Sequence, residues 1–385
     1  MDNMNTYEPL GLKSNPFLSL PLKDYTASFR DLFSARDAQV QRTCSYTGQA
    51  LASFVIAPYG GGKTVVVRES LARLEEAGYQ VVYAIYRRSR GFCRSILKEM
   101  IARGFVDDRS TSEELDQILL GIGNMQRGGK NVVLAIDDLD RAKDIDEVKE
   151  VTNDVREILG EGSAVIITGQ PFGVTFDLNT SAGGIFHKIS IPEFSCADFH
   201  EMLEKYLRSV HVSKELPATH PFDEQAADFI CAEMAVAKLT PRLFNFAVAK
   251  LLVLGSENGV TEFSLDTVRK YWPHLAEDIV VALTDLHRQH LELIIEAKDV
   301  SEDSMSTITE LGGNPLAEYP EVVDEVLRPL LEKNLLLARN DSGKDHYRPT
   351  PHAAMAINNI KENNAMPIKT FISYSHDNPA HSARV

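Results

Sequence analysis

The residues with the most specific chemistry in this 385-residue chain are the consecutive glycines and the Lys-Thr pair of Gly60-Gly61-Gly62-Lys63-Thr64. Because glycine has no Cβ, its backbone N–H groups can turn inward and approach phosphate oxygens closely. The lysine adds an ammonium group that can reach the β- and γ-phosphates, and the threonine adds a hydroxyl that can bind Mg²⁺. The stretch therefore predicts a phosphate-binding loop.

Such a loop needs a strand before it and a helix after it. The apolar run Phe54–Ile56 precedes it, and the helix-compatible stretch Val65–Glu76 follows, with N-terminal dipoles that favour an anion. The spacing is that of G-x-x-x-x-G-K-[ST], except that Ala57 stands at the first glycine, which is acceptable if φ is negative there. The alternative is a glycine-rich turn that precedes Lys-Thr by chance, and the order of strand, loop and helix disfavours it. We expect ATP or ADP with Mg²⁺, bound by the loop residues Pro58, Tyr59, Gly60, Gly61, Gly62, Lys63, Thr64 and Val65.

A second apolar run, Asn131–Ile136, ends in the paired carboxylates Asp137 and Asp138. Buried parallel strands are apolar throughout, and ligands bind at their carboxyl ends. Asp137 would hold Mg²⁺ together with Thr64, directly or through water, and Asp138 could polarise the attacking water. The alternative is that the two aspartates cap the predicted helix Asp144–Leu159. The phosphate-binding loop upstream favours the catalytic interpretation.

Two further positions complete the predicted catalytic set. The buried strand Ser163–Thr168 ends in polar residues, so Thr168 or Gln170 could contact the γ-phosphate or the attacking water, although a polar turn explains them equally well. Arg242 follows a proline at a predicted helix start and could reach the γ-phosphate from a helical lid; otherwise it is an ordinary surface arginine. The predicted catalytic residues are Asp138, Thr168 and Arg242.

Changes in hydrophobic period divide the rest of the chain. Apolar runs over residues 80–86 and 185–191 add strands, so residues 1–192 are predicted to form an α/β domain. Four amphipathic stretches without a strand between them predict a helical lid over residues 193–262. Helices over residues 277–297, 301–309 and 319–333, then a hairpin over 335–350, predict a winged helix within 263–360. Residues 361–385 read as a polar linker and one apolar run.

Composition indicates a soluble, cytoplasmic, multidomain protein without a membrane partner. The chain is 44% hydrophobic, its N-terminus is polar, and no apolar run approaches the length of a membrane span. The cysteines are far apart and read as reduced thiols: Cys44, Cys93, Cys196 and Cys231. A formal net charge of −15 argues against tight non-specific binding of nucleic acid by the whole chain.

The predicted winged helix is acidic. Winged helices often bind DNA, but residues 265–360 hold 17 Asp and Glu against 9 Lys and Arg. The candidate recognition helix carries Glu321, Asp324, Glu325 and Glu332. Because these carboxylates would be repelled by phosphates, DNA is a possible but disfavoured partner.

Taken in order, these motifs resemble the AAA+/STAND class of P-loop ATPases, especially the branch shared with origin-initiator ATPases. The resemblance spans roughly residues 15–355 and is carried by Asn15-Pro16-Phe17, Gly60–Thr64, Asp137-Asp138, Thr168-Gly169-Gln170-Pro171 and Pro241-Arg242. It implies a parallel sheet of order 5-1-4-3-2, with Thr168 or Gln170 as sensor 1 and Arg242 as sensor 2. Asp138 stands where many relatives have the longer Glu, which implies slow ATP hydrolysis. Two segments before the loop's strand, Asn15-Pro16-Phe17 and Phe33-Ser34-Ala35-Arg36, are candidates for adenine contacts; on physics alone they are a turn and the approach to a helix.

The last apolar run, Phe371–Asp377, resembles the opening strand of a SEFIR or TIR domain, and the residues that follow favour SEFIR. The combined resemblance implies a slowly hydrolysing, STAND-type signalling switch that oligomerises on ATP binding and clusters its C-terminal SEFIR/TIR segment, as in antiphage defence. The alternative is an origin-initiator or transposition-type AAA+ ATPase that acts on DNA. A third possibility is a degenerate P-loop scaffold without turnover.

Overall fold

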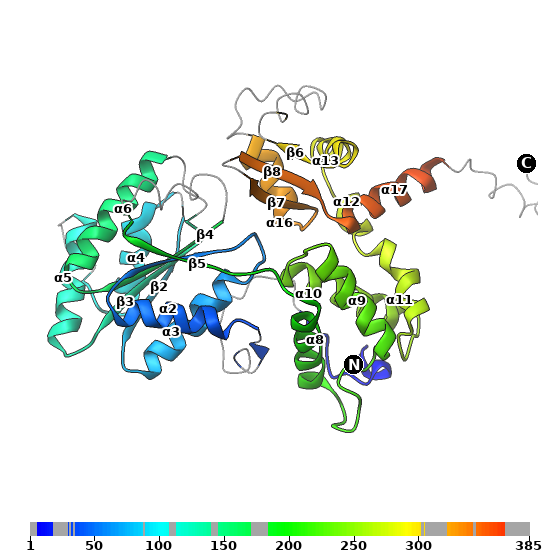
Figure 1. Cartoon of the computed structure of the whole chain (residues 1–385), viewed down its shortest axis with the longest axis horizontal. Helices are drawn as coiled ribbons and strands as arrows, with labels where there is room; N and C mark the ends of the chain where they lie inside the picture. The colour runs from blue at the N-terminus through cyan, green and yellow to red at the C-terminus, as the bar shows by residue number, and fades with distance from the viewer. Residues whose placement is uncertain are drawn as a thin grey trace, which may run out of the picture.

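A computed structural model describes residues 6–17, 30, 32–33, 35–87, 89–107, 113–139, 145–170, 184–301, 304, 322–341 and 344–365. These residues pack into three units, an α/β unit, a helical lid and a third unit that carries a small antiparallel sheet (Figure 1). The predicted helix at 301–309 and the run Phe371–Asp377 lie outside the described residues, apart from Ser301 and Ser304.

A parallel sheet forms the centre of the α/β unit. Among the described residues it has five strands: β1 (Ala52–Ile56), β2 (Gln80–Ile85), β3 (Val132–Asp137), β4 (Ala164–Gly169) and β5 (Phe186–Ser190). Their order is β2-β3-β4-β1-β5, which is the predicted order 5-1-4-3-2 read from the other edge. Every residue of β1, β3 and β4 is buried, as strands covered on both faces require.

Helices cover both faces of this sheet (Figure 1). One face packs against α2 (Asp37–Gly48) and α3 (Lys63–Glu76), and the other against α4 (Gly91–Ala102), α5 (Glu114–Arg127) and α6 (Ile145–Gly160). Alternation along the strands sorts the side chains, because Val55 and Val133 join the first core while Phe54 and Leu134 join the second. Ala135 also belongs to the first core, so Asp137, two residues further along β3, lies on the same face of the sheet as α3.

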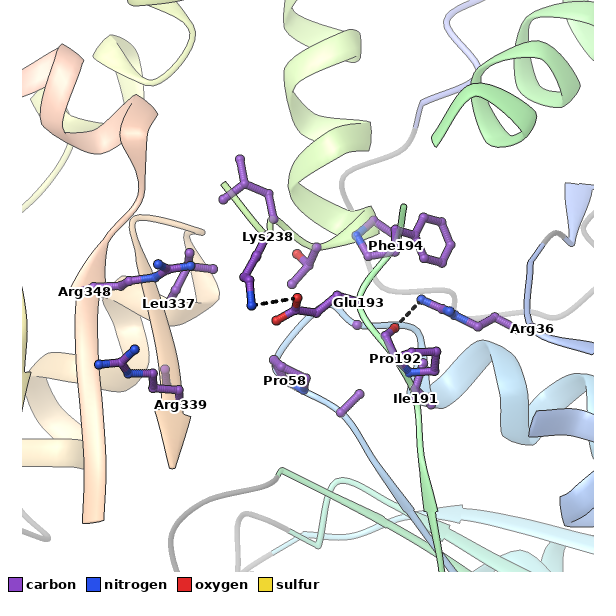
Figure 2. A pocket seen from close by; sticks show the side chains of 16 residues that line it. Arg36, Pro58, Ile191, Pro192, Glu193, Phe194, Lys238, Leu337, Arg339 and Arg348 are labelled. Carbon is purple, nitrogen blue, oxygen red and sulfur yellow. Dashed lines mark hydrogen bonds and ion pairs between the residues drawn. The ribbon is translucent and has the colours of Figure 1, made fainter. Parts of the chain in front are cut away.

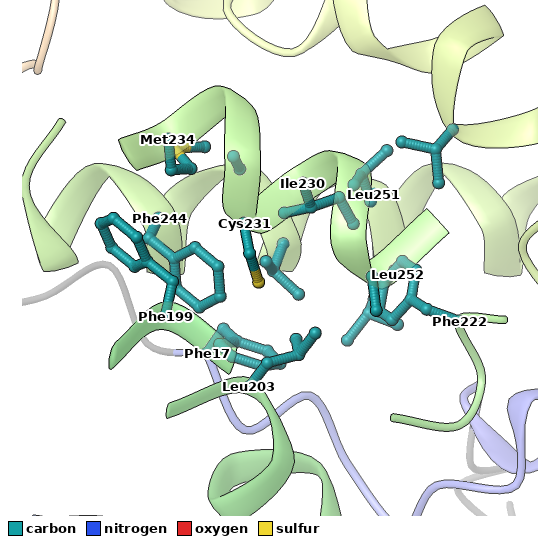
Figure 3. Close-up of a cluster of buried hydrophobic side chains, with 14 of the residues drawn as sticks. Phe17, Phe199, Leu203, Phe222, Ile230, Cys231, Met234, Phe244, Leu251 and Leu252 are labelled. Atoms are coloured by element: carbon teal, nitrogen blue, oxygen red, sulfur yellow. The ribbon is translucent and has the colours of Figure 1, made fainter. Parts of the chain in front are cut away.

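The lid consists of α8 (Cys196–Val210), α9 (Glu224–Val236), α10 (Pro241–Glu257) and α11 (Leu265–Tyr271), which continues into the 3₁₀ turn η4 (Trp272–His274). Each of the α-helices begins after a residue whose side-chain oxygen accepts a bond from a first-turn amide: Ser195, Asp223, Thr240 and Ser264. Their apolar faces meet in one core, in which Phe199 stacks on Phe244 at 4.9 Å between ring centroids (Figure 3).

The N-terminal segment packs into this lid core. Leu10, at the end of the turn η1 (Glu8–Leu10), is fully buried there. Phe17 is 2% exposed and lies among the lid side chains (Figure 3). Its ring stacks on that of Tyr206 at 5.3 Å between centroids. The Lys13 amide donates to the Val210 carbonyl at 2.8 Å, which ties the segment to the end of α8.

Two expectations are corrected by this packing. The α/β domain was predicted to begin at residue 1, but residues 6–17 pack with the lid, because the apolar side chains of Leu10, Leu12 and Phe17 are buried in its core. The proposed adenine contact by Phe17 is also wrong, since its ring is enclosed by lid side chains.

The third unit follows the lid. Its described elements are α12 (Glu277–Val281), α13 (Asp285–Ala297), β6 (Val300–Ser301), the π-helical turn η5 (Val323–Leu327), α16 (Arg328–Glu332), β7 (Leu336–Asp341), β8 (Lys344–Pro349) and α17 (Pro351–Ala365). The strands form an antiparallel sheet of order β6-β8-β7. The predicted hairpin is present, and the name winged helix stays a prediction.

Two boundaries in this unit differ from the sequence-based expectation. The helix expected over 277–297 is interrupted, because the Thr284 hydroxyl accepts a bond from the His287 amide and starts a new helix. The linker expected from residue 361 begins later, because α17 continues to Ala365. Buried Ile357 and the Lys361–Glu292 ion pair, 3.0 Å long, hold this helix against the unit. In the described part of the chain, none of the helices is both long and apolar enough to cross a membrane.

Candidate active site

The glycine-rich loop joins β1 to α3 and has the backbone that its glycines allow. Gly60 and Gly62 have φ of +75° and +97°, and Gly62 is the N-cap residue of α3. Side chains with a Cβ rarely adopt such angles, so glycine is favoured at both positions. Ala57 is not among the residues with positive φ, which explains why alanine is accepted at the first position of the motif.

Lys63 and Thr64 have different partners: the first bonds the loop itself and the second bonds the end of β3. Lys63 is 7% exposed, and its Nζ donates to the carbonyls of Ala57 at 3.0 Å and Pro58 at 3.4 Å. The ammonium group thus lies over the concave side of the loop, where phosphate oxygens would compete for it. The Thr64 hydroxyl donates to Oδ2 of Asp137 at 2.6 Å and so connects the loop to the end of β3.

The carboxylate of Asp137 is the centre of the site. It is 2% exposed and accepts from three hydroxyls, those of Thr64 at 2.6 Å, Tyr83 at 2.8 Å and Thr168. The Asp138 amide also donates to its Oδ1, at 3.1 Å. Asp137 ends β3, and its described partners lie on the loop, β2 and β4, which favours the metal-binding interpretation over the capping alternative.

Asp138 has a left-handed backbone, with φ of +65°. Aspartate tolerates this conformation better than most residues, and such outliers gather at functional sites. Its amide donates to the Thr168 hydroxyl at 2.9 Å, which holds the chain at the turn after β3. The Asp138 side chain is half-buried at the carboxyl edge of the sheet.

The donor set of Thr64 and Asp137 fits Mg²⁺. Both are oxygen ligands, and they lie 2.6 Å apart. Within the described ranges no group of three or more His, Cys, Asp or Glu could hold a metal ion alone. When bound, Mg²⁺ neutralises charge on the β- and γ-phosphates.

The lid touches the loop through the first turn of α10. The Arg242 amide donates to the Gly60 carbonyl at 3.4 Å, and its guanidinium carbon lies 4.9 Å from the centroid of the Tyr59 ring. A Cβ on Gly60 would come within 2.7 Å of the Arg242 Cβ and 2.9 Å of the Thr240 hydroxyl. The lid is therefore in direct contact with the loop at Arg242, the predicted sensor 2 residue.

A cavity of about 370 Å³ opens beside the loop (Figure 2). All three units line it, and its walls include Pro58, Pro192, Leu239 and Leu337. Arg36 lines it from the segment before α2; its guanidinium donates to the Pro192 carbonyl at 2.8 Å and lies 4.0 Å from the Phe194 ring centroid. Burial lowers the pKa of Arg36 to about 10, so the group stays charged at neutral pH.

The third unit supplies two arginines to the same cavity. Arg348, on β8, donates to the Ala237 carbonyl at 3.1 Å, and Arg339, on β7, pairs with Asp299 at 2.6 Å. Lys238 pairs with Glu193 at 3.3 Å within the same space (Figure 2). The cavity thus combines apolar walls with four cationic side chains, of which Lys238 and Arg339 are paired with acids.

The predicted residues fall into one region. Lys63, Thr64, Asp137, Asp138 and Thr168 meet at the carboxyl edge of the sheet, and Arg242 and Tyr59 contact each other above the loop. Pro58 and Gly61 line the cavity, and Val65 lies in the first turn of α3. Gln170 is buried just after β4. Whether these residues bind nucleotide stays a prediction.

Sequence reasoning missed Tyr83 and the hairpin arginines, whereas Arg36, in one of the two segments expected near the base, does line the cavity. A tyrosine inside an otherwise aliphatic buried strand was a usable signal, because a buried phenol hydroxyl needs a partner. Burial, and then the Asp137 carboxylate, raise the pKa of Tyr83 above its ordinary range, so it remains a donor. No comparable signal marked Arg339 and Arg348, whose position depends on how the third unit docks.

Comparison with known proteins agrees with this geometry. Residues 46–175 match the AAA domain family. The chain is similar to Cdc6p from Pyrobaculum aerophilum, with a TM-score of 0.50, 15% identity, and coverage of 90% of this chain and 98% of that one. It is also similar to the Aeropyrum pernix ORC2 protein in its ADPNP-ADP complexes, with a TM-score of 0.51, 14% identity, and coverage of 87% and 96%.

The chain has the fold of these Cdc6p and ORC2 structures. At these identities the likeness establishes the architecture, and the prediction of a P-loop AAA+ sheet with the order 5-1-4-3-2 is confirmed. No curated protein sequence matches the chain.

Proposed function

We propose that this protein is an ATP-binding, slowly hydrolysing AAA+ ATPase that acts as a nucleotide-dependent switch. The observation that carries the proposal is the Asp137 carboxylate, which receives hydroxyl donors from the phosphate loop, β2 and β4 at one point. That arrangement serves to hold a metal ion against a polyphosphate. The ORC2 protein of similar fold was solved with ADPNP and ADP, which supports an adenine nucleotide.

Each residue has a role in this proposal. The loop amides and Lys63 bind the phosphates, and Thr64 and Asp137 hold Mg²⁺. Asp138 orients the attacking water, and Thr168 fixes both aspartates through its hydroxyl. Arg242 stabilises charge on the γ-phosphate from the lid. Hydrolysis is slow because the Asp138 side chain is one methylene shorter than glutamate and reaches the water less well.

The base and ribose would occupy the 370 Å³ cavity, since it adjoins the loop and has apolar walls with cationic corners. The β7–β8 hairpin of the third unit then covers the nucleotide. Exchange of ADP for ATP therefore requires this hairpin to move away from the lid. Release of this unit is the step that would let protomers associate.

Two roles for such a switch differ in their support. An initiator-type ATPase that acts on DNA fits the two similar folds better, although a fold by itself does not fix a function. The acidic balance of residues 265–360 weighs against a broad DNA-binding face. The STAND-type role, in which ATP-driven association clusters a SEFIR/TIR segment, rests on the Phe371–Asp377 motif. We therefore place the initiator-type role first and keep the clustering role as the second candidate.

Measurement of ADP binding tests the part of the proposal that both candidate roles share, namely that the loop binds a nucleotide. Lys63→Ala should abolish ADP binding in calorimetry, because it removes the ammonium group that contacts the phosphates. Lys130→Ala, at an exposed surface lysine, is the matched control and should bind as the wild type does. Normal ADP affinity in Lys63→Ala would overturn the assignment of the loop.

A second pair of measurements separates the two roles. Light scattering in Mg²⁺-ADP and in a slowly hydrolysed ATP analogue would reveal a nucleotide-dependent oligomer. Fluorescence anisotropy with a labelled duplex over a salt series would show a steep salt dependence if several phosphates are contacted. An oligomer without duplex binding favours the clustering role, whereas salt-dependent duplex binding favours the initiator-type role.

A further inference from the structure

We propose that Tyr83 is a positioning residue of this site, which fixes the Asp137 carboxylate for Mg²⁺. The inference rests on the proposed function, since it takes Asp137 as the metal-holding acid. The Tyr83 hydroxyl donates to Oδ2 of Asp137 at 2.8 Å. The same oxygen accepts the Thr64 hydroxyl at 2.6 Å, so Tyr83 acts on the oxygen that faces the phosphate loop.

The sheet register places Tyr83 for this contact. Tyr83 on β2 pairs with Ala135 on β3, and Asp137 lies two residues further along β3 on the same face. The phenol ring can therefore lie along the neighbouring strand and present its hydroxyl to the strand end. Tyr83 is 7% exposed, and a buried phenol hydroxyl without a partner would be unfavourable.

Arg68 strengthens this donor. It lies on α3, after Lys63 and Thr64, and its guanidinium carbon is 3.5 Å from the centroid of the Tyr83 ring. A cation over the face of an aromatic ring is attracted by the ring quadrupole. It also draws electron density from the ring, which makes the hydroxyl a better donor. The phosphate-loop helix thus contacts both sides of the Tyr83–Asp137 pair.

The distribution of donors explains why Tyr83 matters once a metal is bound. Each carboxylate oxygen has room for about two hydrogen bonds. Oδ1 accepts from Thr168 and from the Asp138 amide, and Oδ2 accepts from Thr64 and Tyr83. Because these four donors fill both oxygens, Mg²⁺ or a water bound to it would reach Oδ2 only if the Thr64 hydroxyl turned away, and that hydroxyl would then offer its own lone pair to the ion. Tyr83 has no such second task, so it holds the carboxylate in place while Thr64 adjusts.

The test compares Tyr83→Phe with Tyr86→Phe. Tyr83→Phe removes only the hydroxyl that donates to Asp137. Tyr86→Phe removes a buried hydroxyl that donates to Glu147 instead, away from the loop. ADP affinity is measured by calorimetry in Mg²⁺ and again in EDTA, and the ratio of the two affinities reports the metal contribution.

We expect Tyr83→Phe to reduce this ratio roughly 10-fold, the lower end of what loss of a ligand-orienting partner costs a metal site. Affinity in EDTA should stay at the wild-type value, and Tyr86→Phe should change neither quantity. A wild-type ratio in Tyr83→Phe would overturn the inference. An equal fall of affinity in Mg²⁺ and in EDTA would also overturn it, because Tyr83 would then support the fold rather than the metal site.

A second variant keeps the test valid if Tyr83→Phe does not fold. Arg68→Met removes the cation from the ring and leaves the hydroxyl, so the Mg²⁺ ratio should fall in the same direction by a smaller factor. An unchanged ratio in this variant would count against the inference. Failure of the proposed function is recognised separately, since wild-type protein would then bind ADP neither with nor without Mg²⁺.

Discussion

Contact between the lid and the phosphate loop can be tested with two glycines of the same loop. Gly60→Ala places a Cβ 2.7 Å from the Arg242 Cβ and 2.9 Å from the Thr240 hydroxyl. At Gly62, a Cβ would meet nothing within 4 Å. Both glycines have positive φ, so Gly62→Ala is a control that shares the backbone strain without the clash.

The magnitudes follow from these distances. A left-handed backbone costs a residue with a Cβ about 1–2 kcal/mol, and this term applies to both variants. Carbon atoms pack at about 3.5–4.0 Å, so the Gly60 variant overlaps the lid by nearly 1 Å. Such overpacking costs about 1–3 kcal/mol. We therefore expect the free energy of the lid–loop contact to fall by about 1–3 kcal/mol more in Gly60→Ala than in Gly62→Ala.

Hydrogen exchange followed by mass spectrometry measures the lid–loop contact at the peptide that forms it. The Arg242 amide, which donates to the Gly60 carbonyl, lies in the peptide that covers the start of α10. Exchange of this peptide should accelerate in Gly60→Ala, and it should stay at the wild-type rate in Gly62→Ala. Equal exchange in both variants would refute the reasoning, because the lid would then not rest against Gly60.

Three further predictions concern other contacts. Thr168→Val removes the hydroxyl that bonds Asp137 and the Asp138 amide; it should lower the rate of phosphate release from ATP at least 10-fold and, like Tyr83→Phe, reduce the ratio of ADP affinity in Mg²⁺ to that in EDTA. Phe17→Ala should destabilise the lid by about 3–5 kcal/mol, as truncation of a buried phenylalanine does. Burial lowers the pKa of His352 from 6.5 to about 4, so the folded chain keeps this group neutral while the unfolded chain takes up a proton below about pH 6.5. Stability should therefore fall by up to about 3 kcal/mol as the pH drops from 6.5 toward 4.

Controls for these predictions are available in the chain. Phe17→Leu keeps most of the buried volume and should cost much less than Phe17→Ala. Trp272 is the single tryptophan, 4% exposed and 4.8 Å from the His352 ring, so its fluorescence reports unfolding beside that group. A His352→Gln variant with the same pH dependence of its urea midpoint as the wild type would contradict the assignment to His352.

Local pattern predicted the elements that build the site. The apolar runs before Gly60 and Asp137 predicted strands, and the structure has β1 and β3 there. Strands covered on both faces need apolar residues throughout, which is why the pattern was clear. The position of Thr168 beside Asp137 followed from the sheet order that the resemblance implied. The contact of Tyr83 with Asp137 could not be predicted in this way, because it depends on the register between β2 and β3.

Other features escaped because they depend on contacts between distant segments. Nothing local in Leu10 or Phe17 specifies a lid that begins more than 170 residues later. The extension of α17 to Ala365 contradicts a polar local composition, and burial of Ile357 with ion pairing by Lys361 explains it. The docking of Arg348 against Ala237 likewise results from the packing of two units.

The packing of residues 6–17 into the lid makes the lid a discontinuous domain, with the α/β unit inserted between its first segment and α8. An inserted domain is joined to its host by two covalent connections; here one lies between Phe17 and Arg30, which pairs with Glu69 of α3, and the other at residues 191–195. Rotation of the α/β unit against the lid must therefore be accommodated by both connections together. Deletion of the first seventeen residues would remove part of the lid core and one of the two connections. Both the stability of the lid and its coupling to the α/β unit would therefore change.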